Sequence, residues 1–373
     1  MLVQIFQHES VLEAARRRIA AAFDDYENIC VSVSGGKDST VLAHLVLTEA
    51  KKRDRRVMVF FLDEEVDYEA TIDQIRYIMY EMYPDVAVPM WFQFPFALTN
   101  ATSLEEGQLI AWEPGKHKIW MRSREPRSIH NIPWEAETIT IRNKVKGFGF
   151  YDVIENFESH RKDTCFFVGL RAIESPNRWG TVSKHPGHKD WCWTTNKGNG
   201  NISAYPIYDW YFQDIWKYIY DNNIRYNRIY DLMWKDGIPA QEIRVSSLIH
   251  ERSFKAIVEL PKYEPKTYDK LCARIGGIQV AHIYGKESKM LKCRKLPAAY
   301  KTWREYRDFL LATYPDADKK PIFVRRFSRQ LDNEYVARQQ CRQLVLNDYE
   351  NDLPIRNTED PRQKTLEKWR ALL

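Results

Sequence analysis

A six-residue loop constrains this chain more than any other feature of its sequence. Residues 34–39 read Ser-Gly-Gly-Lys-Asp-Ser, after a β-branched run at 28–34 that predicts a buried strand. A helix is predicted next, at 39–51. Two glycines allow a tight turn that brings backbone N–H groups close to an anion, and a helix start adds partial positive charge. Because Lys37 supplies a full charge, the loop is predicted to bind phosphate.

The spacing of this loop differs from two common phosphate-binding patterns. It fits neither G-x-x-x-x-G-K-[ST] nor the dinucleotide pattern G-x-G-x-x-G. The hydroxyl groups of Ser34 and Ser39 are further donors. A glycine turn that only caps a helix is the alternative interpretation, and the strand and helix on either side disfavour it.

Strand-like and helix-like segments alternate over the first part of the chain. Short apolar runs predict buried strands, and a 3.6-residue periodicity predicts helices. Strands are expected at 28–34, 56–62, 86–94 and 164–169, and helices at 11–25, 39–51, 68–80, 152–160, 210–221 and 227–234. This alternation is typical of an α/β fold, with a doubly wound parallel sheet and helices on both faces.

Two stretches depart from that alternation. Residues 97–150 are rich in Trp, Pro, Gly and basic residues, with eight Lys or Arg against three Glu between 116 and 146. A functional lid and an ordinary surface loop are both open for this insertion. After about residue 260 the pattern is helical, most clearly at 302–312 and 325–346. We therefore predict a first domain at 1–260, with the basic segment inserted at 97–150, and a helical C-terminal region at 261–373.

Composition limits the partners only weakly. A net charge of +5 and 13% aromatic residues are compatible with binding ATP or a nucleic acid, and require neither. No run of 18 apolar residues exists and the first ten residues lack a signal-peptide layout, so a cytoplasmic protein is expected. The six cysteines include no C-x-x-C pair, so no disulfide framework, zinc site or iron–sulfur site is predicted.

The loop resembles the S-G-G-x-D-S fingerprint of the PP-loop ATP pyrophosphatase superfamily. Two further stretches resemble its PAPS reductase-like branch. Gly169-Leu170-Arg171-Ala172-Ile173-Glu174-Ser175, followed by Arg178, is similar to G-x-R-x-x-E-S, and residues 205–230 are similar to P-[IL]-x-D-W…D-[IV]-W…N-x-[IL]-Y. The resemblance covers about residues 10–240 and is best to an uncharacterised group with a helical C-terminal extension. It implies an adenine nucleotide alpha hydrolase-like sheet of five strands in the order 3-2-1-4-5.

The same resemblance implies an activity and a set of site residues. ATP would be cleaved between its α- and β-phosphates, with an acceptor adenylylated and pyrophosphate released, and the implied cofactors are ATP and Mg²⁺. Catalytic roles fall on Lys37, Asp38, Arg171 and Glu174. ATP-binding roles fall on Ser34, Gly35, Gly36, Lys37, Asp38, Ser39, Asp63, Gly169, Arg171, Ser175 and Arg178. Asp38 is also the candidate magnesium ligand.

Several of these assignments have structural alternatives. Arg171 and Arg178 carry planar forks suited to phosphate or sulfate oxygens, and a surface salt-bridge network is the less favoured alternative. The strand 56–62 is followed by Asp63, Glu64 and Glu65, where a carboxylate can meet ribose hydroxyls or magnesium, and an ordinary charged loop is the alternative. Asp209 precedes a predicted helix and is expected to cap it.

The chain departs from true PAPS reductases at their catalytic cysteine. The motif E-C-G-[IL]-H is absent, so reduction of PAPS is not expected. The cysteine-held clusters of DNA phosphorothioation and tRNA-thiolating relatives have no counterpart either. Cys293, flanked by Lys and Arg, is the one thiol whose neighbours would lower its pKa, and Cys341 is expected to be a packing or surface thiol.

Two other clusters have a structural and a functional interpretation. His185 and His188 surround a Pro-Gly pair, which is more typical of a turn than of a metal site. Trp191 and Trp193 lie among lysines and can stack on bases, but a hydrophobic cover is the stronger interpretation.

Three functions remain open from the sequence. The first is an adenylyl-transferring enzyme of unknown acceptor. The second is an enzyme that modifies nucleic acid, which the basic insertion and the tryptophans motivate. The third is a nucleotide-sensing regulator that acts with a ParB-like partner, with phage defence as one open role, and only the resemblance suggests that partner.

Overall fold

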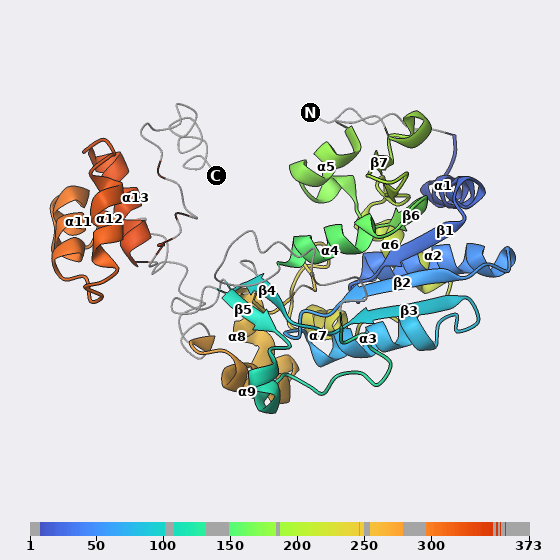
Figure 1. The fold of residues 1–373 in the computed structure, drawn as a ribbon, viewed down its shortest axis with the longest axis horizontal. Coiled ribbons are helices and arrows are strands. Elements are labelled where there is room, and N and C mark those ends of the chain that lie inside the picture. The colour runs from blue at the N-terminus through green and yellow to red at the C-terminus, as the bar shows by residue number, and fades with distance from the viewer. Residues whose placement is uncertain are drawn as a thin grey trace. The chain divides into compact units, whose positions relative to one another are not determined.

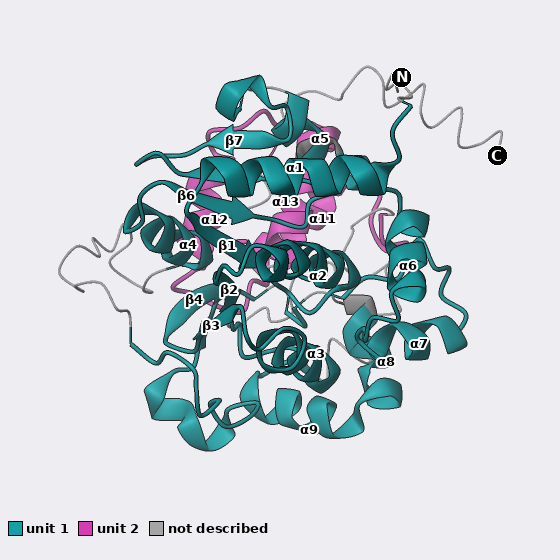
Figure 2. Ribbon diagram, turned by 90° about the vertical axis from the view of Figure 1, so that its right-hand side faces the viewer, with its two compact units in different colours: residues 1–279 teal, residues 280–373 magenta. Residues whose placement is uncertain are grey.

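The structure is a computed structural model that divides into two compact units, Met1–Gln279 and Val280–Leu373. Figure 2 colours the two units separately. The residues described are 8–100, 108–131, 149–183, 187–245, 247–249, 254–278, 296–345, 348–349, 351 and 355. Because the first unit extends to Gln279, the division falls later than the boundary expected at residue 260.

The elements of the first unit alternate as the sequence predicts. The strands are β1 (Asn28–Ser32), β2 (Val57–Leu62), β3 (Ala87–Phe92), β4 (Phe96–Thr99), β5 (Gln108–Ala111), β6 (Thr164–Phe167), β7 (Thr194–Asn196) and β8 (Ile202–Ala204). The α-helices are α1 (Val11–Asp25), α2 (Lys37–Lys52), α3 (Glu69–Tyr80), α4 (Phe150–Ser159), α5 (Pro176–Ser183), α6 (Phe212–Asp221), α7 (Ile229–Lys235), α8 (Phe254–Tyr263) and α9 (Pro265–Arg274). Short 3₁₀ helices are η1 (Pro114–Ile119), η3 (Ala172–Glu174) and η4 (His188–Asp190).

The main sheet has the strand order β3-β2-β1-β6-β8-β7 (Figure 1). Neighbouring strands pair in parallel, except that β7 runs antiparallel to β8. The predicted doubly wound α/β fold is confirmed, but the count of five strands and the order 3-2-1-4-5 are wrong at one edge. There β8 takes the fifth position and β7 adds a sixth. Thr194–Asn196 is short and polar, and its pairing with β8 depends on tertiary structure that no local pattern shows.

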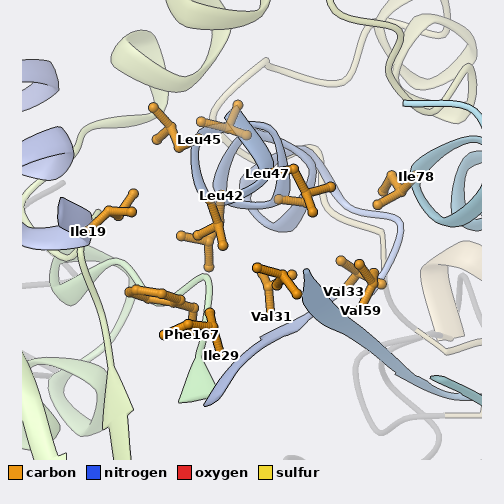
Figure 3. Packing of buried hydrophobic residues seen from close by; sticks show 14 of the residues in the cluster. Ile19, Ile29, Val31, Val33, Leu42, Leu45, Leu47, Val59, Ile78 and Phe167 are labelled. Carbon is orange, nitrogen blue, oxygen red and sulfur yellow. The ribbon is translucent and has the colours of Figure 1, made fainter. Parts of the chain in front are cut away.

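Alternate residues of the strands face two separate cores. In β1, Ile29 and Val31 join a cluster with α1, α2, α3 and α6, while Cys30 joins a second cluster on the other face. Figure 3 shows the first cluster, with Leu42 and Leu47 of α2 above Val31. The second cluster includes Val153 and Phe157 of α4 and side chains of α7, α8 and α9. The sheet is therefore covered on both faces, and its strand ends are left to form a site.

Asp209 has a different role from the expected helix cap. Its carboxylate accepts two hydrogen bonds from Arg18 of α1, at 2.8 and 2.7 Å. Helix α6 begins later, at Phe212, and Asp214 accepts the backbone N–H of Tyr211 at its start. The prediction of a cap at Asp209 is wrong because a buried arginine competes for that carboxylate.

The described part of the insertion is packed into the first unit. It forms the antiparallel pair β4–β5, the helix η1 and the segment that follows η1. Trp112 and Met121 of this segment are buried in the second cluster. Residues 132–148, which include Arg142, Lys144 and Lys146, lie outside the described residues.

The second unit contains the helices α11 (Trp303–Ala312), α12 (Lys320–Phe327) and α13 (Glu334–Val345). They enclose a small core of Phe323, Phe327 and Leu344. The helix predicted at 325–346 is interrupted, because Asn333 accepts the backbone N–H of Val336 and starts α13 anew. No helix among the described residues is long and apolar enough to cross a membrane.

Candidate functional site

The loop that follows β1 turns at Gly35. Its φ of +67° lies in the left-handed region, and a Cβ there would lie 2.8 Å from Cγ2 and 3.0 Å from the carbonyl oxygen of Thr71. Only glycine meets both conditions without strain. Gly36 is extended and is the N-cap residue of α2. The N–H groups of the first turn of α2, which have no carbonyl partner within the helix, are therefore at the loop and favour an anion.

Hydrogen bonds hold this loop from two sides. The Ser39 hydroxyl accepts the N–H of Ser34 at 3.1 Å and is 3.1 Å from the Gly36 carbonyl oxygen. From the segment before α7, the Asn227 amide donates to the Gly35 carbonyl at 3.3 Å. The loop is thus shaped before any ligand binds, which lowers the ordering cost of binding.

Lys37 places a buried positive charge at the start of α2. Its ammonium lies 3.2 Å from the Asp38 carboxylate and 5.3 Å from the centre of the Tyr230 ring, and its backbone N–H donates to the Tyr230 hydroxyl at 3.0 Å. Burial lowers the pKa of Lys37, the Asp38 charge raises it, and the nearby Arg171 lowers it further. A bound triphosphate would raise the pKa of Lys37 again, because its negative charge favours the protonated amine.

Asp38 is the first member of a chain of alternating charges. It accepts a hydrogen bond from Nε of Arg171, and another nitrogen of Arg171 lies 2.8 Å from Glu174. Glu174 also pairs with Arg178. The structure thus brings four residues predicted for the site together at the start of α2. Asp38 is occupied by two cations in this arrangement, and Glu174 orients arginines.

Gly169 and Ser175 flank this chain of charges. A Cβ on Gly169 would lie 3.3 Å from both the backbone N and the Cα of Ser39, so the absence of a side chain lets the end of β6 approach α2. The Ser175 hydroxyl accepts the backbone N–H of Arg178, a contact that caps α5. Gly169 lies at the site, whereas Ser175 acts on the local fold.

A cavity of about 510 Å³ opens beside the loop. Its polar wall contains Ser34, Gly36, Lys37, Asp38, Ser39, Gly169, Glu174, Arg178, Tyr230 and Arg244, and its apolar wall contains Phe60, Phe150, Ile154, Phe157 and Phe166. Glu64 and Asp67 add two carboxylates. This volume and mixed lining suit a ligand with an anionic part and a flat apolar part.

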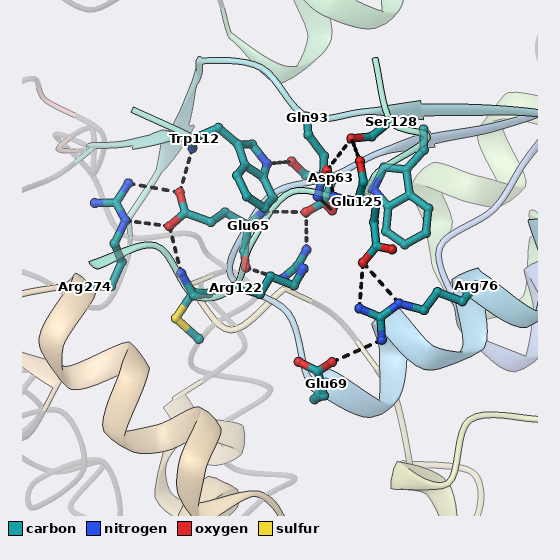
Figure 4. A network of polar contacts seen from close by, with 12 residues as sticks. Asp63, Glu65, Glu69, Arg76, Gln93, Trp112, Arg122, Glu125, Ser128 and Arg274 are labelled. Carbon is teal, nitrogen blue, oxygen red and sulfur yellow. Dashed lines mark hydrogen bonds and ion pairs between the residues drawn. The ribbon is translucent and has the colours of Figure 1, made fainter. Parts of the chain in front are cut away.

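Asp63 does not line this cavity. Its side chain is fully buried and accepts hydrogen bonds from Trp91 Nε1 at 2.8 Å and Gln93 Nε2 at 2.9 Å, and it pairs with Arg122 (Figure 4). Glu65 is also fully buried and pairs with Arg274, with N···O distances of 2.6 and 3.0 Å. The prediction that Asp63 contacts the nucleotide is therefore replaced by a structural role.

Glu64 and Asp67 take the position at the cavity that Asp63 was expected to hold. Among the described residues neither carboxylate forms an ion pair, and burial raises the pKa of both. The pKa of Asp67 rises to about 8 through burial and the charges of Glu64 and Asp63, while Arg122 opposes the rise. An Mg²⁺ ion is usually held by one or two carboxylates and the substrate phosphates, so these two residues fit that ion better than Asp38 does.

Of the two histidines predicted to mark a turn, only His188 is among the described residues. His185 lies outside the described residues, and His188 bonds Asp25 at 2.7 Å and lies 3.3 Å from the Tyr26 hydroxyl. The described residues contain no group of three or more His, Cys, Asp or Glu side chains that could hold a metal ion.

The remaining aromatic and thiol candidates serve packing where they are described. Trp193 is buried in the first core, and Trp191 stacks on it with ring centres 4.7 Å apart. Cys341 is buried in the second unit, and Cys293 lies outside the described residues.

Sequence reasoning missed three residues at the site, and it considered a fourth, Glu64, without separating it from Asp63 and Glu65. Asn227 and Tyr230 support the phosphate loop, and the motif N-x-[IL]-Y that contains them was the available signal. Glu64 and Asp67 belong to an acidic run in which Asp63 and Glu65 are buried and the other two line the cavity, and the sequence did not distinguish these two groups. The alternation of side chains along a strand, continued from β2 past Leu62, is the signal that could have separated the two groups of carboxylates. It is interrupted at Glu65, whose φ is +68°.

Parts of this chain are similar to known proteins and domains. Residues 134–282 match the family model described as the phosphoadenosine phosphosulfate reductase domain, and residues 237–335 match a domain of unknown function, DUF3440. The chain is 29% identical over 318 residues to the uncharacterised protein YbdN of Escherichia coli strain K12, covering 82% of this chain and 76% of YbdN. It is 22% identical over 229 residues to adenosine 5′-phosphosulfate reductase of Bacillus cereus strain AH187, covering 61% of this chain and 78% of that reductase.

A solved structure also aligns with the chain. It is the phosphate complex of PAPS reductase from Candida auris, with a TM-score of 0.36 and 13% identity, covering 62% of this chain and 93% of the reductase. The matched family domain and the shape of the loop 34–39 are similar to those of nucleotide-binding PP-loop proteins. Within that class, the chain is similar to the PAPS reductase-like branch.

Proposed function

We propose that this chain binds ATP with Mg²⁺ in the 510 Å³ cavity and cleaves it between the α- and β-phosphates, transferring the adenylyl group to an acceptor. The observation that carries the proposal is the loop 34–39. It combines the positive-φ turn at Gly35, the N-terminus of α2 and the buried ammonium of Lys37 at one end of the cavity. Such a combination suits a pyrophosphate group.

The rest of ATP fits the remaining walls of the cavity. The adenine ring is flat and largely apolar on its faces, as are the rings of Phe60, Phe150 and Phe157. Arg178 and Arg244 add positive charge on the polar wall. Glu64 would hold Mg²⁺ together with the phosphates, and the ion would supply charge neutralisation.

In the proposed reaction an acceptor hydroxyl attacks the α-phosphorus. The new O–P bond forms as the bond from the α-phosphorus to the β-bridging oxygen breaks, and pyrophosphate leaves with that electron pair. Asp67 takes the proton of the acceptor in its ionised form. Because its pKa is raised to about 8, that carboxylate is a stronger base than an ordinary one, although it is largely protonated at pH 7. Lys37 stabilises the charge that develops on the leaving group.

The test is incubation with α-labelled ATP, Mg²⁺ and cell extract, followed by identification of the molecule that carries labelled AMP. Lys37→Ala should abolish pyrophosphate release and weaken ATP binding in calorimetry at least 10-fold. Lys52→Ala, at the exposed end of the same helix, should change neither. Turnover that survives Lys37→Ala would rule out the mechanism, and an absence of ATP binding to the unmodified protein would rule out the whole proposal.

A nucleotide sensor with a ParB-like partner is the alternative proposal. It predicts that ATP binds at the same loop but stays intact through a long incubation with extract. The fate of the α-label therefore decides between an enzyme and a sensor.

A further inference from the structure

A second hollow lies in the first unit, separate from the ATP cavity. It has a volume of about 860 Å³ and lies between η1 with the segment 120–124 and the beginning of α9, with Arg228 and Glu69 also on its wall. We call it the basic groove. None of its lining residues lines the cavity beside the phosphate loop.

The basic groove has more positively charged side chains than carboxylates to pair with them. Arg122 on its wall pairs with Asp63, and its five other Lys and Arg side chains are Lys118, Arg124, Arg228, Lys266 and Lys270. Within the described part of the chain none of these five forms an ion pair, and all but the half-buried Arg124 are exposed. An array of accessible cations without partners attracts an extended anion.

The two carboxylates on the groove wall are already engaged. Glu264 accepts the backbone N–H groups of Glu69 and Ala70 at 2.7 and 2.9 Å, at the start of α3. Glu69 itself pairs with Arg76 at 3.3 Å. These carboxylates therefore leave the five cations largely uncompensated.

One aromatic ring is held ready at the groove. Nε1 of Trp120 donates to the Glu113 carbonyl at 2.9 Å, which fixes the ring while leaving it half-buried. The Arg124 guanidinium lies 4.8 Å from the centre of that ring. Nε of Arg124 is shielded from water and has no hydrogen-bond partner among the described residues. A buried donor without a partner is costly, so an acceptor from a ligand would stabilise it.

The walls of the groove are rigid. Arg122, between Met121 and Ser123 on the wall, donates to the Glu65 carbonyl at 2.7 Å and pairs with Asp63. On the other side, the Thr267 hydroxyl donates to Glu264 at 2.8 Å. A preformed groove binds an extended ligand with little loss of entropy.

We propose that the basic groove binds single-stranded nucleic acid, with phosphates on the five cations and a base against Trp120. The spread of cations over η1, the 120–124 segment, α7 and α9 exceeds what one small phosphate needs. A positively charged groove with a stacking aromatic ring is the arrangement that binds single strands without sequence preference. This binding requires neither ATP nor the reaction proposed above.

The test is fluorescence anisotropy of labelled 12-nucleotide oligo-dT and oligo-U with the full chain, without ATP, from 30 to 300 mM salt. Affinity should fall steeply with salt. The double variant Lys266→Glu/Lys270→Glu should bind at least 10-fold more weakly at low salt, with a slope of log Kd against log salt reduced by about 1.4, since each lost phosphate contact removes about 0.7. Trp120→Leu should weaken binding about 5-fold and leave the slope unchanged.

The control is Lys51→Glu/Lys52→Glu, which makes the same change in net charge at the exposed end of α2. Equal losses in the control and groove variants would overturn the proposal, because net charge alone would then explain binding. Unchanged affinity in the correctly folded groove variant would also overturn it, as would equal affinity for poly-glutamate of similar length. Since ATP is absent, failure here leaves the ATP reaction untouched, and failure of the ATP reaction leaves this groove untouched.

Discussion

Four carboxylates within five residues divide between two regions of the molecule. Asp63 and Glu65 are fully buried in a network that satisfies them with arginines, indoles and backbone N–H groups. Glu64 and Asp67 line the cavity beside the phosphate loop, and among the described residues neither is paired with a cation. The same residue type serves stability where its charge is neutralised and is available for chemistry where it is not. What separates the two groups is therefore the partner and not the acidic run itself.

The largest effect is expected in the buried network of Asp63 and Glu65. Arg274→Met removes the partner of Glu65 and leaves a buried carboxylate with no countercharge, which should reduce the free energy of unfolding by about 3–5 kcal/mol. Urea unfolding followed by circular dichroism measures this. Lys270→Met, one turn earlier on the same helix and exposed, should change it by less than about 0.5 kcal/mol.

The double variant Glu65→Gln/Arg274→Met sharpens this result. Removal of both charges should recover much of the lost stability, because the main penalty is the uncompensated charge. If Arg274→Met costs no more than its exposed neighbour, the network does not stabilise the fold and the comparison fails.

An intermediate effect is expected at the Gly35 turn of the phosphate loop, beside the cavity that Glu64 and Asp67 line. Gly35→Ala forces a side chain into a left-handed conformation and against Thr71, at an expected cost of about 1–3 kcal/mol. Displacement of the loop should also weaken ATP binding by at least 10-fold in calorimetry. Gly115→Ala is the matched control, since its Cβ would meet no atom within 4 Å. ATP binding that withstands Gly35→Ala would remove the loop from the site.

The smallest effect concerns pH and distinguishes the two groups of carboxylates. With a pKa raised to about 8, Asp67 is protonated at pH 7 and ionised at pH 9. Without Mg²⁺, its ionisation should repel ATP by about 1 kcal/mol, roughly 5-fold in Kd, between these values. Asp67→Asn should remove that part of the pH dependence, and the dependence that remains would belong to Lys37, whose pKa is lowered. An identical profile in the variant would show that Asp67 does not face the nucleotide.

The ionisation of Asp67 should also lower the stability of the folded protein as the pH rises. The pKa of Asp67 is higher in the folded protein than its ordinary value, so folding favours the protonated form. Its contribution is present in acid and is lost as the pH rises towards and through 8. Relative to the unmodified protein, Asp67→Asn should therefore be more stable at pH 9 than at pH 4.

The sequence predicts the parts of this fold that are encoded locally. The strand, glycine turn and helix at 28–52 carry their own apolar and conformational signals, so the loop was predictable at residue level. The role of Asp63 was not, because its partners come from β3 and from Arg122 in the insertion. The antiparallel strand β7 was not predicted for a similar reason. Thr194–Asn196 pairs through tertiary contacts and has no apolar pattern of its own.

The Arg122 side chain has a practical consequence for anyone who designs shorter forms of this chain. It comes from the insertion at 97–150, yet after β2 it pairs with the Asp63 carboxylate and donates to the backbone carbonyl of Glu65. A deletion that joins residue 96 to residue 151 would strip Asp63 of its cation and Glu65 of the N–H groups of Trp112 and Met121. Such a truncated protein should be destabilised where β2 ends, because two buried carboxylates would lose their partners there.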